Sequence, residues 1–91
     1  MAGIIFAQPS YSNPKLLTKE IIAVNNTIKT NKSVVLANSA IEGSEVVLLN
    51  GVELINDIDC DYVFTDDKTI QFNSSWIFEI GDKFFIKYYK K

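Results

Sequence analysis

Hydrophobic and polar residues alternate along the second half of the chain, which is typical of β-strands that bury one face. The clearest case lies between residues 84 and 89, where Phe84, Ile86 and Tyr88 alternate with Phe85, Lys87 and Tyr89. We expect the first set to face a core and the second to form an aromatic and basic stripe on the other side. Turn residues recur about every ten positions, which favours a small antiparallel β-sandwich.

The strongest local signal is the sequence Leu49-Asn50-Gly51-Val52. Asn-Gly between two apolar runs favours a type I′ turn, in which both central residues have positive φ. The resulting two-residue loop sets the pairing of the hairpin. One face is wholly apolar and is expected in the core: Val47, Leu49, Val52 and Leu54. The other face is apolar enough to contact another sheet edge, a loop or a subunit: Val46, Leu48, Glu53 and Ile55.

A second hairpin is predicted between residues 61 and 72. A three-residue loop at 66–68 pairs Tyr62 with Phe72 and Phe64 with Ile70, which gathers four apolar side chains on one face. A two-residue loop would mix apolar and polar residues on both faces, because a slip of one residue exchanges the faces of a strand. We therefore favour the longer loop, although it would place Lys68 in a left-handed conformation where glycine or asparagine is usual.

The first half is less regular. Leu17, Ile21 and Val24 have helical spacing. The β-branched residues around them and the following Asn25-Asn26 nevertheless predict that residues 16–24 form a strand. Short strands are predicted at 27–30 and 33–37, on either side of a turn at Asn31-Lys32.

Residues 1–14 differ from the rest because they are uncharged, apolar and interrupted by Pro9 and Pro14. Each proline removes a backbone donor and extends the residue before it. We expect an extended arm that contacts another chain; a first strand of the domain or a disordered tail are the alternatives. The chain then divides into an arm, residues 1–14, and a β-sandwich domain, residues 15–91. Four apolar side chains of the arm are candidate partner-binding residues: Ile4, Ile5, Phe6 and Tyr11.

Composition argues against an enzyme and against a membrane or nucleic-acid partner. The chain has no His and no Arg, which removes the commonest general base and the bidentate phosphate ligand. The longest wholly apolar runs are four residues, far below the roughly 20 needed to span a bilayer. Residues 1–41 carry a net charge of +3, residues 42–82 of −9 and residues 83–91 of +4. The acidic middle would repel DNA and could face the basic end of a second copy.

Candidate chemistry is sparse, and we expect no catalytic residue, no metal and no cofactor. The spacing of Asp57, Asp59 and Asp61 resembles the start of a calcium loop, but Tyr62 and Lys68 replace its glycine and its bidentate glutamate. These acidic side chains have two remaining interpretations: a looser cation site, or a solvated loop that leads into a strand. Cys60 has no histidine to activate it and is expected to pack half-buried. The aromatic side chains that could stack on sugars or bases are more simply core or subunit contacts: Trp76, Phe85 and Tyr89.

Five short motifs follow one another at the spacing of a known module. They are Leu49-Asn50-Gly51-Val52, Asp61-Tyr62, Thr69-Ile70-Gln71-Phe72, Gly81-Asp82 and Tyr88. In this order, over about residues 28–88, they resemble the small immunoglobulin-like β-sandwich module of tailed-bacteriophage virion proteins, found in tail fibres, baseplates and decoration proteins. The chain departs from that pattern at Cys60, where the module commonly has glycine.

The resemblance implies a structural protein of the virion, made in the host cytoplasm, that docks on capsid, neck or tail proteins. It also points to a homo-oligomer, with a trimer favoured over a dimer. With the arm, we expect one sheet face to bind these partners: Val46, Leu48, Ile55, Phe85 and Tyr89. The alternative function is a host-receptor or glycan-binding module of a phage fibre.

Overall fold

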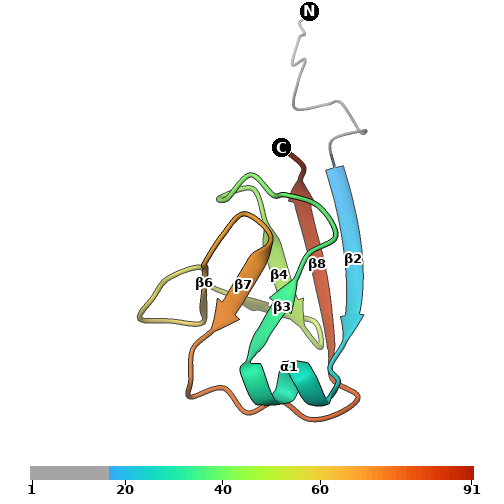
Figure 1. Ribbon diagram of the computed structural model, residues 1–91, viewed down its shortest axis with the longest axis vertical. Coiled ribbons are helices and arrows are strands. Elements are labelled where there is room, and N and C mark those ends of the chain that lie inside the picture. Colours follow the sequence, from blue (N-terminus) through green and yellow to red (C-terminus); the bar gives the residue numbers. More distant parts are fainter. Residues whose placement is uncertain (1–16) are drawn as a thin grey trace, which may run out of the picture.

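The computed structural model describes residues 17–91, which form two antiparallel β-sheets packed face to face (Figure 1). The four-stranded sheet has the order β2-β8-β4-β5 and the three-stranded sheet the order β3-β7-β6. In chain order the elements are β2 (Leu17–Ala23), α1 (Asn26–Asn31), β3 (Ser33–Val35), β4 (Val46–Leu49), β5 (Val52–Leu54), β6 (Tyr62–Phe64), β7 (Thr69–Phe72) and β8 (Lys83–Tyr89). The expected all-β sandwich is confirmed. The predicted arm, residues 1–14, lies outside the described residues.

The Asn50-Gly51 turn joins β4 to β5 as predicted. Asn50 has φ 51° and Gly51 has φ 88°, and Leu49 pairs with Val52. A two-residue loop also predicts the pairing of Val46 with Ile55, but the ladder ends at the pair Val47–Leu54 and this pairing is not formed. Val52 was expected in the core but is 65% exposed, because it directly follows the turn at the end of the hairpin.

The β6–β7 hairpin has the register that the three-residue loop predicts. Tyr62 pairs with Phe72 and Phe64 with Ile70, and the loop is closed by a hydrogen bond from Thr65 N to Thr69 O at 3.0 Å. Lys68 does not have positive φ, so the left-handed conformation expected there is absent. The Asp66 side chain stabilises the turn instead.

Strand β8 lies in the middle of the four-stranded sheet, between β2 and β4 (Figure 1). Its alternation follows the sequence pattern: Phe84, Ile86 and Tyr88 are fully buried between the sheets. A C-terminal strand can take this central place only through pairing with segments far away in the sequence. Leu48 and Ile21 both face Phe85 across neighbouring strands, one on each side.

Residues 26–31 form the helix α1, so the strand predicted at 27–30 is wrong. Asn25 begins the helix, with its side-chain oxygen accepting a hydrogen bond from Ile28 N at 2.9 Å. Lys32 ends it in the left-handed conformation and donates its N–H to Ile28 O. Ile28 is the residue of the helix that is buried, so two caps and one core contact outweigh the β-propensity of this segment. The strand predicted after it, at 33–37, is present as β3 but is shorter.

Aromatic rings fill the space between the sheets. Phe72 of β7 stacks on Phe84 of β8 with ring centroids 4.7 Å apart. Phe78, from the segment between β7 and β8, packs edge-on against both rings. Trp76 stacks on Phe78 at 5.8 Å and is half-buried. These contacts couple the two sheets through residues that are close in space but not in sequence.

Two tyrosine–glutamate hydrogen bonds stabilise the edges of this core. The Tyr88 hydroxyl donates to Glu20 of β2, whose carboxylate also accepts from Ala37 N at 3.0 Å. The Tyr62 hydroxyl donates to Glu45 at 3.0 Å. The pKa of both tyrosines is raised, mainly by burial and secondly by the partner carboxylate.

Candidate interaction surface

A row of exposed apolar side chains crosses the outside of the four-stranded sheet. Ile21 of β2 faces Phe85 of β8, which faces Leu48 of β4, and Leu48 in turn faces Glu53 of β5. Ile21 is 68% exposed and Phe85 39% exposed, while Leu48 is half-buried. A sheet face open to water is normally polar. We call this surface the outer face; it comprises Lys19, Ile21, Val46, Leu48, Phe85 and Lys87.

Lysines flank the apolar row. On the same face, two residues along each strand from Ile21 and Phe85, Lys19 of β2 lies directly opposite Lys87 of β8. Lys83 lies on the other side of the row and is also exposed. Like charges directly opposite on a sheet repel each other. The ion pairs of residues 17–91 lie elsewhere, between Lys29 and Glu79 and between Lys91 and Asp67. The outer face therefore combines apolar area with lysines that form no ion pair within residues 17–91, and Glu53 stands at the β5 end of the apolar row.

The structure brings together most of the predicted docking residues of the domain. Val46, Leu48 and Phe85 lie on the outer face, and Tyr89 continues the same side of β8, where it pairs with Leu17. Ile55 is exposed but lies beyond the end of the β4–β5 ladder. The arm residues Ile4, Ile5, Phe6 and Tyr11 lie outside the described residues.

Ile21 and Lys19 belong to this surface and were not among the predicted docking residues. The alternation of Leu17, Lys19 and Ile21 was visible in the sequence. It could not be assigned to a face, because the partner of β2 is the C-terminal strand.

The loop between β5 and β6, residues 55–61, is the second prominent exposed feature. It projects on the side of the molecule away from β2, where it is coloured yellow in Figure 1. Ile58 at its tip is 76% exposed and stands between the exposed residues Asp57 and Asp59. Backbone hydrogen bonds hold the loop in shape, including Cys60 N to Asp57 O at 2.9 Å and Asp57 N to Tyr62 O at 2.9 Å.

The carboxylates of this loop are not arranged as a metal site. Asp61 accepts from Ile55 N at 2.7 Å, and Asp57 accepts from Asp59 N at 2.8 Å. Within residues 17–91, no three acidic or cysteine side chains converge closely enough to hold a metal ion. Cys60 is exposed, which corrects the expectation that it packs half-buried. Desolvation in the loop, and then the neighbouring carboxylates, raise the pKa of its thiol. A thiol with a raised pKa is a poor nucleophile.

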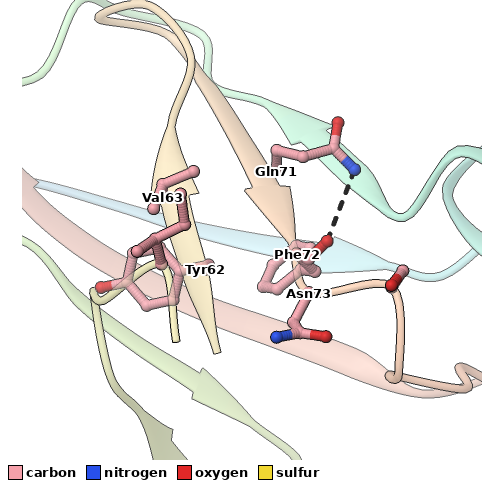
Figure 2. A pocket seen from close by; sticks show the side chains of 7 residues that line it. Tyr62, Val63, Gln71, Phe72 and Asn73 are labelled. Carbon is pink, nitrogen blue, oxygen red and sulfur yellow. Dashed lines mark hydrogen bonds between the residues drawn. The ribbon is translucent and has the colours of Figure 1, made fainter. Parts of the chain in front are cut away.

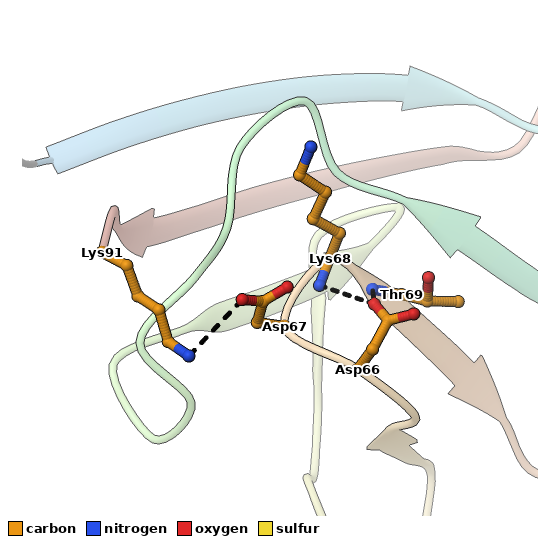
Figure 3. Close-up of polar contacts among 5 residues, drawn as sticks. All are labelled: Asp66, Asp67, Lys68, Thr69 and Lys91. Atoms are coloured by element: carbon orange, nitrogen blue, oxygen red, sulfur yellow. Dashed lines mark hydrogen bonds and ion pairs between the residues drawn. The ribbon is translucent and has the colours of Figure 1, made fainter.

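Asp66 and Asp67, the adjacent carboxylates of the β6–β7 turn, each have a structural partner (Figure 3). Asp66 accepts from Lys68 N and from Thr69 N, both at 2.8 Å, and these hydrogen bonds lower the pKa of its carboxyl. Asp67 forms an ion pair with Lys91 at 3.4 Å, which joins the turn to the C-terminus. Both groups are therefore engaged in holding the turn.

A cavity of about 260 Å³ lies beside β6 and β7 (Figure 2). Apolar side chains of Ile58, Val63 and Phe72 line it together with the polar groups of Gln71 and Asn73. The Gln71 amide donates to Asn31 O and Lys32 O, both at 3.0 Å. Its donors are thus occupied by the backbone between α1 and β3, so the pocket offers few free polar groups to a ligand.

Comparison with known proteins assigns no relative. No protein-family model matches this sequence, and no significant match was found among curated proteins or among solved structures. Residues 17–91 contain no helix of the length and apolar character that crossing a membrane requires.

Proposed function

We propose that this chain is a structural protein of a tailed-bacteriophage particle and that it docks on other virion proteins through its outer face. The observation that carries the proposal is the apolar row of Ile21, Phe85 and Leu48 across a sheet face that is open to water. Burying such side chains against a partner contributes roughly 25 cal/mol per Å² of apolar area, before the costs of association.

The order of sequence motifs supports the virion as the setting. In the structure, Asn50-Gly51 forms the turn between β4 and β5, and Tyr62 begins β6. The motif residues form turns and core and carry no catalytic chemistry. The resemblance therefore indicates a structural component and not an enzyme. Which virion protein receives the outer face is a further part of the proposal, with capsid, neck and tail proteins as candidates.

The test is to locate the chain in purified particles of the phage that encodes it. We expect a fixed copy number per particle by quantitative mass spectrometry, and crosslinks from Lys19 or Lys87 to another virion protein. Particles made with Phe85→Glu should lack the protein, whereas Val35→Glu, an exposed residue of the other sheet, should leave it in place. A chain found only in the soluble host fraction, and absent from particles, would contradict the proposal.

The alternative role, a host-receptor or glycan-binding module, depends on the cavity beside β6 and β7. The Tyr62 ring and the Asn73 side chain, which both line this cavity, are the features that favour a small sugar as its ligand. Saturation-transfer NMR with a panel of bacterial cell-wall sugars would show transfer to the ligand if this role holds. Asn73→Ala should abolish that transfer, and Phe85→Glu should leave it unchanged.

A further inference from the structure

We infer that the outer face of one copy binds the Asp57-Ile58-Asp59 tip of a second copy of this chain. This names a partner for the docking surface and rests on its proposed docking role. Each surface has what the other lacks. The outer face presents apolar side chains between lysines, and the tip presents one apolar side chain between aspartates.

The charges complement each other in sign and in arrangement. Lys19 and Lys87 lie side by side on the outer face, with no ion pair to either within residues 17–91. Their mutual repulsion decreases when a carboxylate approaches both. Asp57 and Asp59 are exposed, and neither carboxylate has an ion-pair partner in the described part of the chain.

The apolar contacts complement each other as well. Ile58 is 76% exposed, a large fraction for an isoleucine in a loop whose backbone is well ordered by hydrogen bonds. Ile21, Phe85 and Leu48 form a row onto which one aliphatic side chain can pack. Because the loop is already held in shape, little conformational entropy would be lost when it binds.

The two surfaces are separate on each molecule, since the loop projects away from β2 (Figure 1). Every copy thus offers one tip and one outer face. Contacts of this heterologous kind continue from copy to copy and close into a ring when the rotation between copies allows it. Two copies that exchange this contact form an isologous, two-fold pair, and a heterologous ring begins with a trimer.

Sedimentation velocity with the full chain and two charge-reversed variants tests this contact. The face variant carries Lys19→Glu and Lys87→Glu. The tip variant carries Asp57→Asn and Asp59→Lys; asparagine keeps the side-chain oxygen that accepts from Asp59 N. We expect the wild-type chain to associate in low salt, and each variant alone to weaken the association at least about tenfold. An equimolar mixture should associate again, because the acidic tip of the face variant meets the unchanged outer face of the tip variant.

Controls separate this contact from general effects of charge and stability. Lys68→Glu with Glu79→Lys changes exposed charges outside both surfaces and should not alter the association. Ile58→Ser removes the apolar contact without a change of charge and should weaken the association in a chain that melts like the wild type. Raising the salt to 1 M should weaken it as well, since the screening length falls to about 3 Å.

Several outcomes would overturn the inference: a wild-type chain that stays monomeric to millimolar concentration, variants that associate like the wild type, or a mixture that fails to associate. A monomer that nevertheless binds virion proteins through Phe85 would overturn the inference and leave the proposed function standing. A chain that self-associates through these surfaces but is absent from virions would contradict the proposed function and leave the inference standing.

Discussion

The two hairpins of the sandwich reach the same antiparallel pairing by different means. The β4–β5 turn depends on backbone conformation, with positive φ at Asn50 and Gly51. The β6–β7 turn has no residue of positive φ and depends on the Asp66 carboxylate, which accepts two backbone N–H groups. The first turn is therefore sensitive to whether its residues tolerate positive φ, and the second to the carboxylate of Asp66. A short sequence can specify a turn through either route.

The hairpins also differ in how they contact the core. The inner face of β6–β7 is buried almost throughout, with Ile70 fully buried. In β4–β5 the inner face leaves the core at the turn, where Val52 is 65% exposed. Equivalent positions in the two sequence patterns thus have unequal energetic importance.

The largest expected effect comes from truncating these two residues. Ile70→Ala should lower the free energy of unfolding by about 2–5 kcal/mol, because it leaves a cavity between the sheets. Val52→Ala should change it by less than about 0.5 kcal/mol, as an exposed substitution does. Urea denaturation of both variants measures the difference. Equal losses would show that the burial of the two hairpins is not as described.

The next effect concerns the backbone of the β4–β5 turn. Gly51→Val should destabilise the fold by about 1–3 kcal/mol, because a β-branched residue is strained at positive φ. No atom beyond the neighbouring residues lies within 4 Å of a Cβ added at Gly51, so the cost would come from strain and not from a clash.

Two substitutions serve as controls in the same urea experiment. Gly51→Asn should cost less than valine, because asparagine tolerates left-handed conformations. Lys68→Gly in the other turn should not stabilise, because Lys68 has negative φ. A stabilising Lys68→Gly would mean that the two turns share the same mechanism.

A smaller effect is expected where the two hairpins are joined. Tyr62→Phe removes the hydrogen bond from β6 to Glu45, just before β4, and should cost about 0.5–1.5 kcal/mol. Glu45 keeps its hydrogen bond from Asn56 Nδ2 at 2.9 Å, so the carboxylate is not left without a donor. Thermal unfolding measures the loss. Because the folded state raises the pKa of Tyr62, the wild type should also lose stability above about pH 10, and the variant should lose less.

The smallest effect is a dependence on acid that both turns share. Hydrogen bonds lower the pKa of Asp66 in the β6–β7 turn and of Asp82, which accepts from Glu79 N and from the Asn50 side chain of the β4–β5 turn. For a lowered pKa, the stabilisation is present above the unfolded value near 4 and is lost as the pH falls. Melting temperatures from pH 6 to pH 2 should fall less steeply for Asp66→Asn and Asp82→Asn than for the wild type. Parallel curves would exclude these carboxylates as the cause.

The candidate docking surface was predictable in part. Val46, Leu48 and Phe85 could be assigned to one side of their strands from alternation and from the Asn50-Gly51 turn alone. Ile21 could not, although it is the most exposed member of the apolar row. Its strand pairs with β8, more than 60 positions later, and no local pattern specifies that partner.

The sequence by itself determined the features that depend on neighbouring residues. The register of both hairpins, the positive φ of the Asn50-Gly51 turn and the buried set of β8 follow from turn chemistry and from the two-residue period of a strand. Tertiary structure alone decided the order of strands, and its burial of Ile28 added to two local caps to make residues 26–31 a helix. It also decided which apolar residues remain outside, such as Val52 and Ile21, and that two lysines meet on the outer face. The physical reason is that these features depend on contacts between distant segments, whose energies no local pattern contains.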